Sequence, residues 1–313
     1  MISIAYNELD HLHDLDNHVE NSERTKVIIS KIKEIREKKE IKADFFVANE
    51  LRYSDEIISW VKLVHKHDYI DLLIQKVKKI KKIDFLDPDT YITPHTLDVV
   101  FTNLELLFEL CDRIIKSNGM GFAYIRPPGH HAESNRAMGF CIINNVAVLA
   151  RFIQKQYNMK KIMIVDFDAH HGNGTQEIFY EDSSVLYFST HAYPFYPFTG
   201  SLSEKGRSEG YGYTYNFPLS IYAGDKELIN IYENEFISVF DSFQPDFLIV
   251  SSGYDIHSHD PITYMTCSTN GIKKIKDIII SKAGGKNLIF VLEGGYNLNV
   301  LKEVVEDDIN RIK

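Results

Sequence analysis

Short apolar runs alternate with amphipathic stretches along most of the chain. Residues 160–165 are rich in apolar, β-branched side chains, which is typical of a strand buried on both faces of a sheet. Residues 22–39 repeat apolar positions at helical spacing, with an acid near the start and basic residues near the end, which favours an amphipathic helix. The other predicted helices cover residues 93–117, 144–157, 226–240, 271–281 and 300–312, and the other predicted strands cover residues 121–125, 185–189, 213–217, 247–255 and 287–292. Strands separated by helices predict an α/β fold, with a mainly parallel central sheet and helices on both faces.

No Pro- or Ser-rich linker and no internal repeat interrupts this alternation. A length of 313 residues allows two domains, but α/β folds often reach this size as one. With 44% hydrophobic residues the chain can bury a large core. We therefore predict a single domain over residues 1–313.

A run of lysines in residues 76–82 resembles at first sight a patch for anionic lipid or nucleic acid. Because Val77, Ile80 and Ile83 fit one helical stripe, we interpret the run as the solvent-exposed face of a helix. The formal net charge is −9, from 35 Lys+Arg against 44 Asp+Glu. This charge disfavours direct binding to nucleic acid, which usually needs a basic surface, and is compatible with a cationic substrate such as a lysine peptide or a polyamine.

The composition also predicts the compartment. The three cysteines form no CxxC pair, which indicates a reducing environment without disulfides. Residues 1–6 are soon followed by charged residues and do not resemble a signal peptide. No apolar run approaches the ~20 residues that a membrane span requires. We therefore expect a cytoplasmic protein with no membrane partner.

Two histidine-centred segments carry the candidate chemistry. They are RPPGHHA at residues 126–132 and DFDAHHGNG at residues 166–174, and the second directly follows a predicted strand. If the extended conformation continues, Asp166, Asp168 and His170 project to the same side at the carboxyl end of that strand, where open α/β sheets tend to place their chemistry. Asp-x-Asp-x-His then predicts part of a metal site; the alternative is a solvated, inert turn.

A third candidate ligand is the acid at the end of residues 247–255. Asp168, His170 and Asp255 would give zinc one nitrogen and two oxygens, leaving room for water and a substrate oxygen. A closed structural zinc site would more often use several cysteines. The sequence therefore favours an open, catalytic site.

Together these segments resemble the zinc-dependent histone deacetylase family, including its bacterial relatives the acetylpolyamine amidohydrolases. Further matching segments are HVENSER at residues 18–24, VHKHDYI at residues 64–70, GFC at residues 139–141 and LEGGYNL at residues 292–298. The first of them departs from the family, which usually has prolines at the positions of Val19 and Ser22. Asn173 resembles the class II branch, since class I has an acid there. The resemblance implies the arginase/deacetylase α/β fold.

The resemblance also implies catalytic roles. His131 would be the general base and the proton donor to the leaving amine, and His130 an electrostatic or proton-relay partner. Asp166 and Asn173 would orient His130 and His131, respectively. Tyr296 would donate to the substrate carbonyl oxygen. The alternatives are that one histidine is merely packed and that Tyr296 is an ordinary loop residue.

The resemblance further implies a tunnel for the acyl-lysine side chain. Phe140 and Tyr196 would be its aromatic walls, although Phe195 or Phe198 could take the place of Tyr196. The carbonyl of Gly139 would be left free for the substrate amide.

Two residues near the tunnel bear on the substrate. Asp89 would anchor the substrate backbone or a polyamine nitrogen. Some polyamine-specific relatives place a glutamate after the Asp-Pro that follows the third metal ligand, whereas Ile262 stands there in this chain. We therefore predict a deacylase of Nε-acyl-lysine or a similar acylated amine. The alternatives are an acetylpolyamine amidohydrolase and a catalytically silent binding protein; a two-manganese arginase-like enzyme needs a different order of ligands.

The family also carries a structural monovalent cation behind the zinc. The side chain of Asp166, the hydroxyl of Ser189 and the carbonyls of Asp168, His170 and Thr190 would bind it, so we expect potassium as a second ion. The natural substrate, the preferred acyl chain, the metal used in cells and the oligomeric state are left open.

Overall fold

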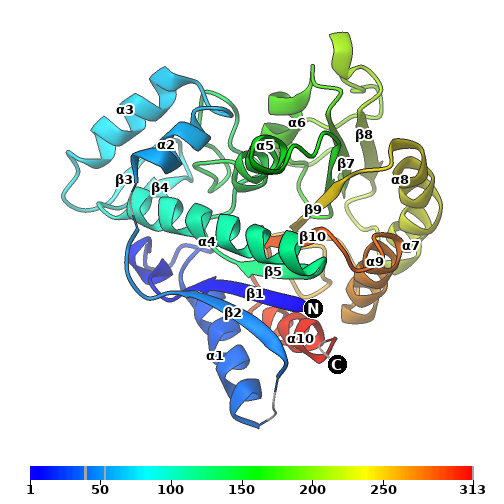
Figure 1. Ribbon diagram of the computed structural model, residues 1–313, viewed down its shortest axis with the longest axis horizontal. Helices are drawn as coiled ribbons and strands as arrows, with labels where there is room; N and C mark the ends of the chain where they lie inside the picture. Colours follow the sequence, from blue (N-terminus) through cyan, green and yellow to red (C-terminus); the bar gives the residue numbers. More distant parts are fainter. Residues whose placement is uncertain (39–40, 53, 312–313) are drawn as a thin grey trace.

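An eight-stranded sheet forms the centre of the computed structural model, which describes residues 1–38, 41–52 and 54–311 (Figure 1). Its strand order is β2-β1-β5-β10-β9-β6-β7-β8, and every neighbouring pair is parallel. The strands are β1 (Ile2–Asn7), β2 (Ala43–Ala48), β5 (Met120–Tyr124), β6 (Ile162–Asp166), β7 (Val185–Ala192), β8 (Thr214–Leu219), β9 (Phe247–Ser252) and β10 (Leu288–Leu292). A small antiparallel pair, β3 (Asp84–Phe85) and β4 (Tyr91–Ile92), lies apart from it.

Helices cover both faces of this sheet (Figure 1). They are α1 (Glu23–Lys38), α2 (Asp55–Val61), α3 (His67–Val77), α4 (Thr96–Ser117), α5 (Asn145–Tyr157), α6 (Asn173–Phe179), α7 (Asp225–Ile231), α8 (Ile237–Phe243), α9 (Thr269–Lys282) and α10 (Leu298–Asn310), with short 3-10 turns at Asp10–Leu12 and Ser208–Gly210. A π-helical turn, Tyr232–Phe236, joins α7 to α8, so the predicted helix over residues 226–240 is one helical segment with a local widening.

Strand side chains alternate between two apolar clusters, one on each face. Met163 and Val165 of β6 pack with side chains of α1, α7, α9 and α10, whereas Ile162 and Ile164 pack with those of α2, α3, α4 and α5. This is the alternation that a strand covered on both faces requires. The predicted parallel α/β sheet is therefore confirmed.

The local predictions differ from the structure in two respects. Strands β1 and β2 were not predicted, although both are largely apolar; β2 is an edge strand whose side chains are mostly half-buried. Helix α3 ends at Val77, and residues 78–82 form turns and bends, so the predicted helical face over residues 76–82 is wrong. After the turn, Lys76 donates to the carbonyl oxygen of Phe85 and pairs with Asp84. The predicted helix ends at residues 39 and 312 lie outside the described residues.

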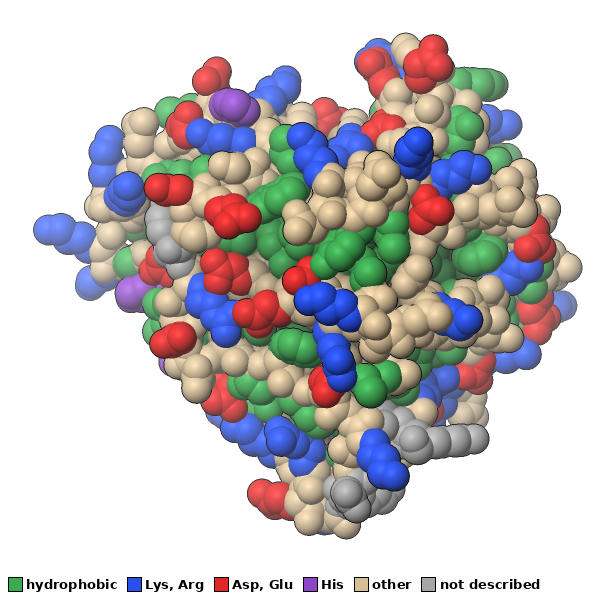
Figure 2. All heavy atoms as spheres, in the orientation of Figure 1, with side chains coloured by type: hydrophobic (Ala, Val, Ile, Leu, Met, Phe, Trp, Pro, Cys, Tyr) green, Lys and Arg blue, Asp and Glu red, His purple; other side chains and the backbone are tan. Residues whose placement is uncertain are grey.

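The surface charges and the length of the helices are relevant to the predictions about nucleic-acid and membrane partners. On the face shown in Figure 2, basic and acidic side chains are interspersed. Within the described ranges, no helix combines the length and the apolarity needed to cross a membrane. The cytoplasmic location stays a prediction.

Candidate metal centre and catalytic cavity

The candidate site lies where four adjacent strands end. Strands β5, β10, β9 and β6 are neighbours in the middle of the sheet, and all four run in the same direction. The RPPGHHA segment follows β5, the DFDAHHGNG segment begins at the last residue of β6, Asp255 follows β9, and the LEGGY segment follows β10. Parallel pairing therefore brings together segments that lie far apart in the sequence.

Asp168, His170 and Asp255 converge as predicted. The Nδ1 atom of His170 lies 3.1 Å from Oδ1 of Asp168 and 2.9 Å from Oδ2 of Asp255, and the three ligand atoms lie within 4.8 Å of one another. Both acids are buried, and the His170 side chain is 12% exposed. The expected extended conformation does not continue, because β6 ends at Asp166. Asp166 accordingly lies outside the ligand set: one of its oxygens contacts the His130 ring and the hydroxyl of Tyr187.

The surroundings of these three residues fit a divalent cation. A Cβ atom on Gly294 would lie 2.5 Å from Oδ2 of Asp168 and 2.7 Å from Oδ2 of Asp255, and one on Gly253 would overlap the Asp168 carboxylate. Glycine thus lets the main chain pass directly beside both acids. Burial and the neighbouring Asp168 charge raise the pKa of Asp255 to about 7. A cation between the two acids would remove this repulsion, and one nitrogen with two oxygens suits zinc.

The two adjacent histidines each face a different polar partner. Nδ1 of His130 lies 3.1 Å from Asp166, and Nδ1 of His131 lies 2.8 Å from Oδ1 of Asn173. The amide group of Asn173 donates through Nδ2 to Glu133 at 2.8 Å, so its oxygen must face His131. That oxygen can only accept, so the Nδ1 atom of His131 carries the ring proton and Nε2 is left with a free lone pair.

The two rings are driven to opposite protonation states. Burial lowers the pKa of His131 well below its ordinary value, and the neighbouring His130 and His170 lower it further. Burial also lowers the pKa of His130, but the carboxylates of Asp166 and Asp168 outweigh that effect and raise it to about 10. These opposite pKa shifts favour a neutral ring for His131 and a protonated ring for His130.

A cavity of about 140 Å³ adjoins the candidate metal centre. It is lined by Asp89, Pro128, His130, His131, Gly139, Phe140, Asp168, His170, Tyr196, Ile262, Gly294 and Tyr296. All five predicted substrate-binding residues are among them. Of the three candidates for the second aromatic wall, Tyr196 lines the cavity, Phe195 stacks on His170 with ring centroids 5.3 Å apart, and Phe198 is 73% exposed.

The residues predicted to bind potassium make hydrogen bonds to protein groups. The hydroxyl of Ser189, a predicted ligand, lies 2.8 Å from Nδ1 of His191. The predicted ligand atom of Thr190 is its carbonyl oxygen, and the hydroxyl of this residue lies 3.2 Å from that of Tyr232. The potassium ion stays a prediction.

A buried arginine braces the turn that carries Tyr296. Arg24, which is 1% exposed, donates to the carbonyl oxygens of Glu293 at 2.5 Å and Gly295 at 2.7 Å. Its guanidinium carbon lies 4.8 Å from the centre of the Tyr296 ring. It also pairs with Glu20 at 3.2 Å.

Glu20 holds a second arginine as well. Its two oxygens accept from Nε and NH2 of Arg126 at 2.8 and 2.7 Å, and both side chains are fully buried. Arg126 begins the loop that carries the two histidines. No role was predicted for Glu20 or Glu293, because Arg126 lies 106 positions from Glu20 and Gly129 lies 164 positions from Glu293, and contacts this distant leave no local pattern. The charged residues within the matching segments were the available signal.

A larger hollow of about 730 Å³ lies elsewhere, between α1 and the segment after β1. Its lysines, Lys26 and Lys33, pair with Glu23 and Glu8. It contains none of the residues of the candidate site.

Comparison with known proteins gives a consistent result. Residues 18–312 match a profile of the histone deacetylase domain. Histone deacetylase 10, chloroplastic, of Oryza sativa subsp. japonica is 37% identical over 228 residues, which cover 70% of this chain and 51% of that protein. A probable deacetylase of Archaeoglobus fulgidus is 39% identical over 204 residues, which cover 61% of this chain and 56% of that protein. The chain spans about half the length of the curated relatives it matches.

The fold is also that of a solved deacetylase domain. The crystal structure of the HDA15 HD domain matches with a TM-score of 0.90 at 30% identity, over 99% of this chain and 89% of that one. This agreement confirms the predicted single-domain arginase/deacetylase fold. Because the domain profile covers nearly the whole sequence, the chain belongs to the histone deacetylase domain family.

Proposed function

We propose that this chain is a zinc-dependent deacylase that hydrolyses the acetyl amide of Nε-acetyl-lysine or a similar acylated amine. The observation that carries the proposal is the meeting of two carboxylates and an imidazole within 4.8 Å, at a cavity that also contains a neutral histidine and a tyrosine. Family membership supports the reaction class.

Asp168, His170 and Asp255 would hold the zinc ion. When bound there, zinc supplies Lewis-acid activation of the amide carbonyl and of water, whose pKa it can lower to about 7. Every other task falls to side chains of the cavity.

His131 moves the proton. Its Nε2 lone pair accepts a proton from the attacking water, and the resulting imidazolium donates it to the leaving amine. Asn173 holds the ring in the required tautomer through Nδ1. The positive charge of His130, held by Asp166, and the hydroxyl of Tyr296 would stabilise the negative charge that develops on the substrate oxygen.

The cavity walls suit a methylene chain ending in an amide. Phe140 and Tyr196 present aromatic surface, and burying apolar area contributes about 25 cal/mol per Å². Burial and the neighbouring Asp87 raise the pKa of Asp89 to about 6, so at neutral pH this residue is still mainly an acceptor for substrate N–H groups. Ile262 contributes an apolar side chain where a glutamate would favour polyamines.

Removal of the metal tests the proposal. We expect the purified chain to contain about one zinc per molecule and to release acetate from an acetyl-lysine peptide. A chelator should abolish that release, and added zinc should restore it. Zinc binding without chelator-sensitive turnover would instead indicate a binding protein, and faster turnover of acetylated polyamines would favour the small-molecule amidohydrolase.

Asn173, the hydrogen-bond partner of His131, is neutral, and this predicts the pH at which the acidic limb of the activity profile lies. Replacing Asn173 with aspartate puts a carboxylate next to the imidazole and raises its pKa, so the base stays protonated to higher pH. The acidic limb of kcat/KM should then move upward by about 1–3 pH units.

This substitution needs a compensating change, because an aspartate at position 173 would repel Glu133. The comparison is therefore N173D/E133Q against E133Q alone. An unchanged acidic limb in the double variant would exclude Asn173 as the group that sets the pKa of His131.

A further inference from the structure

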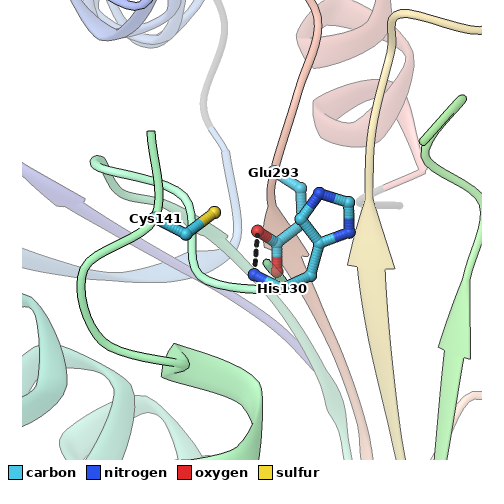
Figure 3. Close-up of side chains that lie close together, drawn as sticks. All are labelled: His130, Cys141 and Glu293. Atoms are coloured by element: carbon cyan, nitrogen blue, oxygen red, sulfur yellow. Dashed lines mark hydrogen bonds between the residues drawn. The ribbon is translucent and has the colours of Figure 1, made fainter. Parts of the chain in front are cut away.

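The side chain of Glu293 lies against the backbone of the histidine loop (Figure 3). Glu293 is fully buried and directly follows β10. Its Oε2 atom accepts from the backbone N–H groups of Gly129 at 2.7 Å and His130 at 3.1 Å, and its Oε1 atom accepts from the hydroxyl of Ser251 at 3.1 Å. The thiol of Cys141 and the ring of His130 lie on opposite sides of the carboxylate in Figure 3.

His130, Cys141 and Glu293 have the residue types of a second metal site, and their ligand atoms lie within 4.8 Å of one another. Their hydrogen bonds argue against that role. Both oxygens of Glu293 already accept, and Nδ1 of His130 faces Asp166. Burial also raises the pKa of the Cys141 thiol, which keeps it protonated. We therefore interpret His130, Cys141 and Glu293 as a structural cluster that fixes the backbone and not as a metal site.

We propose that Glu293 is a positioning residue that sets the direction of His130 and His131. Two of its partners are backbone N–H groups, which can only donate, so the group at this position must accept from both, as a carboxyl oxygen does. Hydrogen bonds from backbone amides to a buried carboxylate are about twice as strong as those between neutral groups. Fixing two consecutive amides fixes the backbone from which both histidine side chains project.

Other side chains contact the histidine loop at different groups from those that Glu293 contacts. The carbonyl oxygen of Arg126 accepts from Asn103 at 2.7 Å, and that of Pro127 accepts from Asn145 at 3.1 Å. These contacts hold the carbonyl groups at the start of the loop, whereas Glu293 holds the N–H groups of Gly129 and His130.

The residues that follow Glu293 also contact, or belong to, the rest of the candidate site. The N–H of Gly294 donates to Oδ2 of Asp168 at 2.8 Å, and Tyr296 follows two residues later. One short turn therefore touches the histidine loop, a candidate metal ligand and the candidate oxyanion donor. Glu293 thereby fixes the separation between the base and the oxyanion donor, a distance for which an error of about 1 Å can cost a hundredfold in rate.

Three variants test this role, which rests on the proposed deacylase function. Glu293→Leu removes the acceptor at similar volume. Glu293→Gln keeps an amide oxygen for the two backbone N–H groups and removes the charge. Ser251→Ala is the matched control, because it removes only the partner of the other oxygen. Each is assayed for kcat, KM, zinc content and thermal unfolding beside the unchanged protein.

We expect kcat of E293L to fall about 10–100-fold, with KM and zinc content near those of the unchanged protein. E293Q should lie between E293L and S251A, which should stay close to the unchanged protein. Unchanged kcat in a folded, zinc-loaded E293L, or a loss confined to KM, would overturn the proposal. If E293L does not fold, E293Q decides: kcat equal to that of S251A overturns it, and lower kcat at equal KM supports it. Absence of chelator-sensitive turnover in the unchanged protein would instead refute the deacylase function itself.

Discussion

Replacing His131 with asparagine is expected to lower kcat by about 10²–10⁴-fold while zinc binding and KM change little. The asparagine amide can still donate to Oδ1 of Asn173, as Nδ1 of the imidazole does at 2.8 Å. What the variant lacks is the Nε2 lone pair, which the low pKa of His131 keeps available at neutral pH. The substitution therefore removes the base and leaves its anchoring contact in place.

Steady-state kinetics with metal analysis distinguish this effect from damage to the site. Zinc content should remain at one per chain, since His131 is not one of the three candidate ligands and its ring hydrogen-bonds to Asn173, a contact that H131N retains. The exposed His11, replaced with asparagine, is the control and should leave kcat unchanged. If H131N keeps more than a tenth of the original kcat, the base is another residue.

The second large effect concerns stability. Replacing Glu20 with glutamine should lower the free energy of unfolding by about 3–5 kcal/mol, because it removes the carboxylate that pairs with two buried guanidinium groups. Arg126 loses a bidentate partner, and Arg24 loses its only acidic contact among the described ion pairs. Urea unfolding measures the change.

The same contacts predict how this contribution depends on pH. Burial alone raises the pKa of Glu20, but Arg126 and Arg24 outweigh it and hold the pKa at about 2, below the usual 4.5. The contribution of Glu20 is therefore fully present above pH 4.5 and is lost as the pH falls toward 2. Glu23→Gln, which breaks an exposed pair with Lys26, is the control and should leave stability unchanged. Equal stability of the two variants would contradict the buried-charge account.

The parts of the site that the sequence could predict are those encoded by short local patterns. Asp168, His170 and Asp255 each lie just beyond an apolar strand, and parallel strands bring such positions to one edge. The contact of Asp166 with His130, which the family resemblance implied, is present as well. The assumed extension of the strand is not, because β6 ends at Asp166.

The remaining errors come from contacts that local patterns do not encode. The stripe of Val77, Ile80 and Ile83 matched a helix, but α3 ends at Val77 and the chain returns far enough for Lys76 to contact the carbonyl oxygen of Phe85. The role of Glu293 depends on partners more than 160 positions away, such as Gly129. The choice of Tyr196 over its aromatic neighbours depends on how one loop folds back on the cavity.

The strand order has a consequence for synthesis of the chain. In the sheet, β2, β1 and β5 are separated from β6, β7 and β8 by β10 and β9, which are the last two strands in sequence. A nascent chain that has emerged only as far as β8 therefore holds two half-sheets that share no strand pairing. The two halves join only when residues 247–292 leave the ribosome and insert between them, so folding should be slow and both inner edges should stay exposed until then.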